Sequence, residues 1–577
     1  MLQGWLQIAF FCAALVAVMP LLGGYMARVF SNETVGLTRI VGPLERGIYR
    51  VLRVDVTREQ DWKAYARSLI ALSLLFWLAL YLILRTQTLH PFNPQGFHSG
   101  TWDVTFNTVS SFVTNTNWQF YGGETTMSYF SQMAGLAVQN FVSAAVGIVV
   151  VVALIRGIVA RREGNPGIGN FWRDLVRALL YVLLPLSILG ALLLMSQGVI
   201  QSFSHHLGFT SLTGTSGQLA LGPVASQEAI KELGTNGGGF FNVNSAMPFE
   251  NANGLTNFIE MFLILLIPVS LTSTYGRMVG NRRQGWAIFA AMASLFVVAV
   301  AVVYVAEQHG TPAQQLAGMT GGNMEGKELR FGIANSSLWT AVTTVTSCGA
   351  VNAAFESLTG IGGLVPFANL SASETIFGGV GTGLYSMLLF ALLAVFIGGL
   401  MVGRTPEFLG KKIEVREIKL VSIGVLFTPI AVLIGSALAL GTKYGAPSIY
   451  AEGPQGFSET LYAYMSQANN NGSALAGYTG YYQPRPGNLS AHGITFADVL
   501  GGLTMMFARY VPILIVLSVA GSLARKKVAP AGLGTMRTDN GTFVVLLVGV
   551  VVLVGALTFF PALLLGPIVQ GLTDQVF

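Results

Sequence analysis

Charged residues are scarce in this chain of 577 residues, since Asp, Glu, Lys and Arg together make up only 10%. Ordinary soluble domains contain about 25%. Hydrophobic residues make up 52% of the chain. A soluble protein of this size and balance would be hard to keep in solution, so the composition excludes that class and indicates an integral membrane protein.

Cysteine is nearly absent as well. Only Cys12 and Cys348 occur, which excludes a disulfide framework or a cysteine-rich metal cluster. The six histidines are dispersed along the chain, which argues against a histidine metal site. The net charge of +6 suggests no nucleic-acid partner, because the basic residues lie in short linkers between apolar stretches.

Motifs for ATP hydrolysis are missing too. The sequence contains no Asp-Lys-Thr-Gly phosphorylation motif. Its nearest approach to a phosphate-binding G-x-x-x-x-G-K-[ST] loop, from Gly403 to Lys412, has the wrong spacing. We therefore expect no catalytic activity from this chain alone and no organic cofactor.

Ten apolar stretches are long enough to cross a bilayer, which takes about 20 residues. The first is expected to be a retained span and not a cleaved signal peptide, because Leu2-Gln3-Gly4-Trp5 lacks a basic residue. The predicted spans are 5–27, 68–87, 131–155, 178–196, 256–276, 285–305, 379–403, 420–440, 497–523 and 543–567.

Basic residues alternate between the linkers. The linkers after the first, third, fifth, seventh and ninth spans hold most of the 32 Lys and Arg residues. The positive-inside rule places these linkers in the cytoplasm. Both termini and the four long linkers, 88–130, 197–255, 306–378 and 441–496, are then predicted to lie outside.

Each long linker contains one short polar stretch, and the four stretches recur at near-equal intervals. They read Thr114-Asn115-Thr116-Asn117, Thr235-Asn236-Gly237-Gly238, Thr346-Ser347-Cys348-Gly349 and Asn469-Asn470-Asn471-Gly472. When Thr116, Gly237, Gly349 and Gly472 are taken as equivalent positions, the intervals between successive stretches are nearly equal. Four such stretches, each between two spans, indicate a fourfold pore built from one polypeptide.

A short amphipathic helix is expected before each stretch. The first covers 102–112, the second begins near Ser226, and the others follow Asn335-Ser336 and Ser458-Glu459. All four units have the same orientation, unlike the inverted repeats of many secondary transporters. Their C-terminal ends would point at one place, and the partial negative charge of helix C-termini favours a cation there.

The chemistry of the stretches points to K⁺ as the bound ion. Backbone carbonyls can hold a dehydrated K⁺ ion, and Gly and Asn readily adopt the left-handed dihedrals that turn successive carbonyls inward. No carboxylate is present to suit a divalent ion. The predicted filter residues are Asn115, Thr116, Asn117, Thr235, Asn236, Gly237, Gly238, Thr346, Ser347, Cys348, Gly349, Asn470, Asn471 and Gly472.

Taken singly, each stretch has an ordinary interpretation. The last is typical of a turn, the second of a flexible loop or an anion-binding nest, and the third of a helix end. Their repetition favours the pore.

The sequence thus predicts an all-α membrane protein with a pseudo-fourfold, channel-like pore of four span–loop–span repeats. The repeats are expected at 68–155, 178–276, 285–403 and 420–523. An extra span with its cytoplasmic loop (1–67) and another span (543–567) complete the single domain.

The stretches resemble those of the potassium-binding A subunits of bacterial Kdp potassium-transporting ATPases. The resemblance covers nearly the whole chain. It rests on Thr114 to Gln119, Gly234 to Asn251, Thr346 to Asn352, Gly403 to Glu407, Asn469 to Gly477 and Gly555 to Phe559. The stretch from Gly477 to Gly493 departs from the family pattern as a longer outer loop.

The resemblance implies the fold of the K⁺ transporter superfamily and a role as the ion-selecting subunit of a pump in the bacterial inner membrane. A P-type ATPase B subunit would hydrolyse ATP. A C subunit and a small one-span F peptide would complete the complex.

Two features inside the predicted spans are candidates for a barrier or gate. Arg509 lies in the ninth span, where a charge is costly and usually faces a cavity or a partner. It would either form a positive barrier below the filter or pair with Glu260. Gly381 and Gly383 lie in a glycine-rich start of the seventh span. They would mark a break in the helix or close helix packing.

Two other functions remain open. One is a stand-alone K⁺ channel or ion-coupled symporter with the same architecture. The other is a membrane-embedded enzyme, which the sequence disfavours because no group of His, Asp and Glu is expected within the spans.

Overall fold

Ten long apolar helices form the bundle in the computed structural model, which describes residues 1–161, 167–401, 403, 405–480, 496–530 and 535–572. All ten are long and apolar enough to cross a membrane, so the prediction of about ten spans is confirmed. Their bounds are Leu2–Phe30 (α1), Trp62–Arg85 (α3), Ser131–Val159 (η2 and α6), Phe171–Ser196 (α7, η3 and α8), Gly254–Met278 (α10), Arg282–His309 (α11), Thr382–Met401 (α15), Val415–Gly441 (α16), Phe496–Ala524 (α18) and Gly541–Ile568 (α19 and η7).

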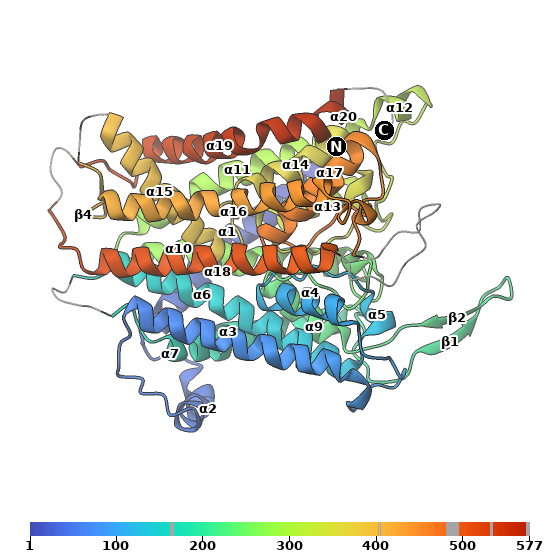
Figure 1. The fold of residues 1–577 in the computed structure, drawn as a ribbon, viewed down its shortest axis with the longest axis horizontal. Helices are drawn as coiled ribbons and strands as arrows, with labels where there is room; N and C mark the ends of the chain where they lie inside the picture. Colours follow the sequence, from blue (N-terminus) through green and yellow to red (C-terminus); the bar gives the residue numbers. More distant parts are fainter. Residues whose placement is uncertain (162–166, 402, 404, 481–495, 531–534, 573–577) are drawn as a thin grey trace.

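Four short helices lie among the long ones, near one end of the bundle (Figure 1). They are Trp102–Val113 (α4), Val224–Leu233 (α9), Gly332–Val345 (α13) and Gly453–Ala468 (α17). The first agrees with the sequence prediction. The last three begin earlier than predicted, and α13 and α17 start at glycines with positive φ, Gly332 (66°) and Gly453 (63°).

The remaining elements are short and mostly peripheral. The helix Gly360–Ser371 (α14) was not predicted, and the segment 372–381 separates it from α15. The others are Thr38–Val51 (α2), Gly123–Thr126 (α5), Pro312–Leu316 (α12), Val569–Leu572 (α20), the 3₁₀ turns Gln87–Leu89, Asn244–Ala246, Phe355–Ser357 and Ala446–Ser448, and the antiparallel pairs Leu207–Thr210 (β1) with Ser216–Leu219 (β2) and Glu407–Phe408 (β3) with Lys411–Lys412 (β4).

The two ends of the bundle differ. The start of α1, the last described helix α20 and the β1–β2 hairpin lie at the end that holds the short helices, whereas α2, α7 and β4 lie at the other (Figure 1). Several spans begin at that second end with an Asn or Asp whose side chain caps the helix. Asp61 accepts from the Ala64 N–H at 2.8 Å, and Asn540 accepts from the Phe543 N–H at 3.0 Å.

Small residues let the central helices approach closely. A side-chain carbon at Gly157 of α6 would lie 2.4 Å from the Ala520 carbonyl oxygen of α18. A side-chain carbon at Gly23 of α1 would lie 2.5 Å from the Ser270 carbonyl oxygen of α10. Close packing through small residues is how helices associate where the lipid is as apolar as the helix surface. Arg404, within the stretch from Gly403 to Glu407, and most of the 477–493 loop lie outside the described residues.

A bidentate ion pair joins two spans near the end that carries α2 and α7. The Arg156 guanidinium of α6 donates to Asp174 at 2.5 and 3.0 Å, and the Asp174 side chain is fully buried. The Tyr65 hydroxyl also donates to Asp174, at 3.3 Å. Removing one partner of such a pair leaves an uncompensated buried charge.

Arg156→Gln is therefore expected to destabilise the protein by about 3–5 kcal/mol, because Asp174 loses its bidentate partner. The measurement is thermal unfolding of the purified protein in detergent. Arg161→Gln is the matched control, because Arg161 follows the same helix and is exposed. Equal unfolding temperatures for the two variants would contradict the assigned role of the pair.

Candidate functional site

The four predicted polar stretches each follow the C-terminal end of one short helix. We define them as loop 1 (114–118), loop 2 (234–238), loop 3 (346–350) and loop 4 (469–473). They follow α4, α9, α13 and α17 respectively, and nearly all of their residues are buried. All fourteen predicted residues lie in these loops.

The backbone of each loop contains two left-handed residues separated by one residue. The pairs, with their φ values, are Asn115 (69°) and Asn117 (55°), Thr235 (50°) and Gly237 (82°), Ser347 (49°) and Gly349 (91°), and Asn470 (52°) and Gly472 (99°). Such alternation turns the carbonyls of consecutive residues toward one side. Thr235 and Ser347 hold a conformation that costs roughly 1–3 kcal/mol and that is concentrated at functional sites.

The middle residue of each loop makes the same backbone hydrogen bond. Its N–H donates to the carbonyl five residues earlier in the short helix: Thr116 to Ser111 (2.9 Å), Asn236 to Lys231 (2.8 Å), Cys348 to Thr343 (3.0 Å) and Asn471 to Ser466 (2.8 Å). These hydrogen bonds pair the N–H groups of the four middle residues with carbonyls of the short helices, so the N–H groups point toward the helices. The four loops therefore share one conformation despite their different sequences.

The carbonyl oxygens of these four middle residues accept no hydrogen bond from the part of the chain that the structure describes. Among the hydrogen bonds of the described residues, none ends on the carbonyl of Thr116, Asn236, Cys348 or Asn471, although all four residues are fully buried. A buried carbonyl without a partner is unusual, because leaving it unpaired costs free energy comparable to a lost hydrogen bond. Four such carbonyls at equivalent positions are suited to a shared cationic ligand.

The loops close into a ring. A side-chain carbon at Gly237 would lie 2.0 Å from the Cys348 carbonyl oxygen, which places loop 2 against loop 3. In the same way Gly349 lies against the Asn471 carbonyl, and Gly472 against the Thr116 carbonyl. Loop 1 meets loop 2 through the Asn115 amide, which donates to the Thr235 carbonyl at 3.0 Å. The order is therefore 1–2–3–4–1, with no gap.

The ring corrects one detail of the sequence prediction. Pairing the stretches through Thr116 and Gly237 is wrong by one residue, because the residue equivalent to Gly237 is Asn117, the second left-handed position of loop 1. Thr346 precedes the left-handed pair of loop 3, and Gly238 follows that of loop 2. In loop 1 an asparagine occupies the second left-handed position, where the other three loops have glycine. Residue type alone therefore does not show which positions are equivalent.

Arg509 and residues of loop 4 line the same cavity, so Arg509 lies close to the ring. Its lining includes Asn469 and Asn470 of loop 4, Arg509 of α18, and Glu374. The Arg509 guanidinium donates to the Thr382 hydroxyl at 2.8 Å, so the alternative pairing with Glu260 is wrong. Burial raises the pKa of the Glu374 carboxyl to about 7, while the attraction of Arg509 and a hydrogen bond with Thr382 act in the opposite direction.

The predicted glycine-rich break lies just before α15, not inside it. The segment 372–381 joins α14 to α15 without regular structure, and Gly381 has a φ of 91°. A side-chain carbon at Gly381 would lie 2.0 Å from the Gly147 carbonyl oxygen of α6. Gly383 lies in the first turn of α15, against the backbone of Gly378.

This segment touches the ring directly. The Val380 N–H donates to the Thr235 hydroxyl of loop 2 at 2.9 Å. Ser373, Glu374 and Phe377 are also left-handed, so the segment holds several strained residues beside the cavity. Glu374 was not predicted as a site residue, although a carboxylate beside a glycine-rich stretch in an apolar region was a usable signal.

The expectation that no group of His, Asp and Glu would form within the spans did not foresee a group that lies only partly in a span. Among the described residues, one group of three such side chains is close enough to share an ion: Glu228 and Glu232 of α9, and Glu260 of the span α10. Glu228 and Glu232 lie four residues apart on one face of a short helix, a spacing visible in the sequence. Glu260 joins them only through the tertiary fold.

Comparisons with known proteins agree with this architecture. The family model described as the potassium-transporting ATPase A subunit matches residues 9–572. The chain belongs to this family. A relative from Granulibacter bethesdensis, named "Potassium-transporting ATPase potassium-binding subunit", is 52% identical over 574 residues, which cover 99% of this chain and 98% of the relative. A relative of the same name from Solibacter usitatus is 53% identical over 568 residues, 98% of each chain.

A solved structure shares the fold at low sequence identity. The potassium transporter TrkH from Vibrio parahaemolyticus aligns with a TM-score of 0.50 at 14% identity, covering 78% of this chain and 84% of TrkH. At that identity the likeness supports the fold alone. Together with the ten apolar helices, it supports a multi-pass membrane protein with a fold similar to that of TrkH.

Proposed function

We propose that this chain is the potassium-binding and selectivity subunit of an ATP-driven K⁺ uptake complex. The observation that carries the proposal is the closed ring of four loops with a buried, unpaired carbonyl at the middle of each. The relatives named potassium-binding subunits support the choice of ion.

The chemistry of the ring suits a weakly hydrated monovalent cation. Its oxygens are carbonyl dipoles, and none of the four loops contains a carboxylate. The four short helices end at the ring, so the partial negative charge at their C-termini adds to its attraction for a cation. Carbonyl oxygens of modest field strength can replace the hydration shell of K⁺. The fourteen predicted residues of the loops would form this filter, with the register given above.

The ion would pass from the filter to a partner subunit and not through an open pore. We infer a barrier at Arg509 and a gate in the segment that contains Gly381 and Gly383. Support comes from the cavity shared by loop 4, Arg509 and Glu374, and from the hydrogen bond between Val380 and Thr235. Because the segment is hydrogen-bonded to loop 2, a movement of the segment would displace loop 2 and so change the ring.

The complex would contain partners that supply the energy. We propose a P-type ATPase B subunit, a C subunit and a small one-span F peptide as these partners, as the sequence resemblance implies. We place the complex in the bacterial inner membrane, with both termini outside and the arginine-rich linkers inside. The division into four repeats at 68–155, 178–276, 285–403 and 420–523, with extra spans in 1–67 and 543–567, belongs to the same proposal.

The competing function is a self-sufficient K⁺ channel or symporter, which the TrkH-like fold also permits. The test is gentle purification of the tagged chain from its native membrane. We expect a P-type ATPase to copurify and the preparation to hydrolyse ATP faster with K⁺ than with Na⁺. A chain that purifies alone and carries K⁺ after reconstitution would contradict the subunit proposal and support the alternative.

A further inference from the structure

A buried group of charges is centred on α9 and α10 and contacts loop 3 of the ring from behind. The Lys231 ammonium is 2.8 Å from a carboxylate oxygen of Glu228 and 3.7 Å from one of Glu232, and it contacts Glu250 directly. Glu260 of α10 completes the group, and each of the five side chains is at most 1% exposed. One ammonium therefore faces four carboxyl groups in the interior of the protein.

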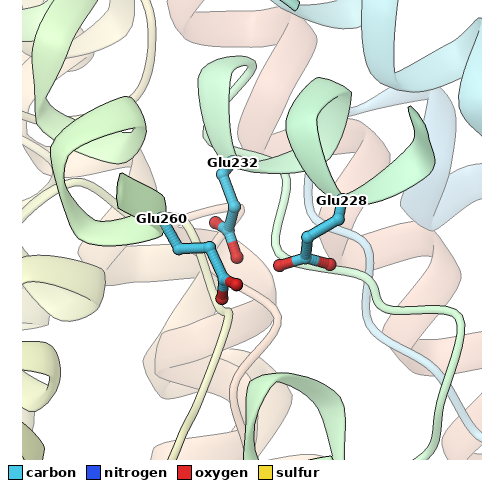
Figure 2. A group of neighbouring side chains, drawn as sticks. All are labelled: Glu228, Glu232 and Glu260. Carbon is cyan, nitrogen blue, oxygen red and sulfur yellow. The ribbon is translucent and has the colours of Figure 1, made fainter. Parts of the chain in front are cut away.

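Glu260 is the member of this group without a partner. It is fully buried, and neither of its carboxylate oxygens has a hydrogen-bond partner among the described residues. Figure 2 shows its carboxyl group turned toward those of Glu228 and Glu232, so that all three face a common space. A buried carboxylate without compensation is very costly, so the Glu260 carboxyl group requires either a proton or a positive charge in this space.

The spacing of the three carboxyl groups fits one ion. A ligand oxygen from each residue can be chosen so that all lie within 4.8 Å of one another. Because 4.8 Å is the upper limit of these separations, an ion between the three oxygens would lie at most about 2.8 Å from each, and separations of about 4.5 Å or less would give Ca²⁺–oxygen distances of about 2.6 Å. All the donors are carboxylate oxygens, the ligands that hard cations prefer.

We propose that Glu228, Glu232 and Glu260 bind a divalent hard cation, Ca²⁺ or Mg²⁺, at a structural site separate from the ring. Charge supports a divalent ion. Lys231 already pairs with Glu228 and Glu250, and if all four carboxyl groups are ionised, one ammonium leaves three negative charges uncompensated. A divalent ion cancels two of those three charges. Because the site is buried, the ion is acquired as the protein folds and exchanges slowly.

The site is connected to two loops of the ring. A Glu232 oxygen accepts from the Cys348 thiol of loop 3 at 3.3 Å. The Ser245 hydroxyl donates to Glu228 at 3.2 Å and to Glu232 at 3.4 Å. Next to Ser245, the Asn244 amide donates to the Gly237 carbonyl of loop 2 at 2.8 Å. The ion thus stabilises loops 2 and 3 from behind. An effect on K⁺ selection rests on the proposed function, but the presence of the ion does not.

The experiment is metal analysis of the full chain, purified together with any copurifying subunits in buffers without chelator. We expect about one Ca²⁺ or Mg²⁺ ion per native chain by plasma mass spectrometry, and loss of that ion in Glu260→Gln. Glutamine keeps the size of the side chain, and its amide can donate to the neighbouring carboxylates, so the fold is preserved. Glu325→Gln is the control, because Glu325 is an exposed glutamate and its replacement should leave the metal content unchanged.

A second measurement keeps the proposal falsifiable even if Glu260→Gln fails to fold. The native protein is unfolded by heat with and without prolonged EDTA treatment, and Ca²⁺ or Mg²⁺ alone is then added back. We expect the unfolding temperature to fall with EDTA and to recover with one of the two ions. A native chain that contains no stoichiometric metal overturns the proposal, as does equal metal content in Glu260→Gln. If an infrared band of a protonated carboxyl group disappears in Glu260→Gln, a proton neutralises Glu260 and not a metal ion, which also overturns the proposal.

Discussion

Gly237→Asp is expected to reduce the preference for K⁺ over Na⁺ by at least about tenfold, a difference of about 1.4 kcal/mol between the two ions. Gly237 is left-handed, with a φ of 82°, which disfavours any side chain. A side-chain carbon there would lie 2.0 Å from the Cys348 carbonyl oxygen and 2.5 Å from the Ala350 nitrogen. Both atoms belong to the backbone of loop 3, so the ring itself must shift. The added carboxylate also strengthens the local field, which favours the smaller, more strongly hydrated ion.

Two matched variants separate the causes. Gly237→Ala adds the clash without the charge, and we expect a smaller loss of selectivity from it. Gly208→Asp adds the same side chain in the exposed strand β1, where nothing lies within 4 Å, and selectivity should not change. The measurement is K⁺-stimulated against Na⁺-stimulated ATP hydrolysis of the purified complex. If Gly237→Asp prefers K⁺ over Na⁺ as strongly as the native protein does, loop 2 is not part of the filter.

The long helices and the four loops could be predicted because their signals are local. A span is set by length and hydropathy, and the ten stretches that satisfy both became ten helices. The polar stretches stand out for the same reason, as Gly- and Asn-bearing breaks in an apolar sequence. The helix α14, which begins Gly360-Ile361-Gly362-Gly363, could not be found in this way, because glycine disfavours helix and only tertiary packing makes this stretch helical.

The register of the ring could not be predicted because conformation there does not follow residue type. Gly237, Gly349 and Gly472 occupy the second left-handed position, but Asn117 occupies it in loop 1. Thr235 and Ser347 are left-handed although local preference disfavours it. The closed ring and the short helices hold these residues in place. Sequence alone therefore identified which stretches meet, and the three-dimensional contacts were needed to align them.

The buried charges show the same limit more clearly. The sequence left open two roles for Arg509, a barrier below the filter or a pair with Glu260, because both residues are charged and both lie in spans. In the structure the two residues have different neighbours: Arg509 bonds to Thr382 of α15, and Glu260 faces Glu228 and Glu232 of α9. Which buried charges meet depends on how the short helices and the 372–381 segment fill the spaces between spans, and periodicity carries no information about that.

Arg509→Gln is expected to raise passive K⁺ flow through the chain by roughly tenfold or more, because one unit charge near an ion path changes its free energy by a few kcal/mol even at an effective dielectric constant of about 20. Arg509 lines the same cavity as Asn469 and Asn470 of loop 4. An ion that leaves the ring on that side meets a guanidinium held by the Thr382 hydroxyl. Glutamine retains a donor for Thr382 and removes only the charge. The measurement is K⁺ flux into liposomes that contain the purified complex, without ATP.

Arg509→Lys is the control that decides between a charge barrier and a structural role. Lysine keeps the positive charge but loses the planar, multi-donor geometry of arginine. A charge barrier predicts native, low flux in Arg509→Lys and raised flux in Arg509→Gln. A structural role predicts that both variants unfold at lower temperature and that flux does not follow the charge. Equal flux in the two variants would exclude Arg509 as the barrier and would leave the segment around Gly381 as the element that closes the path.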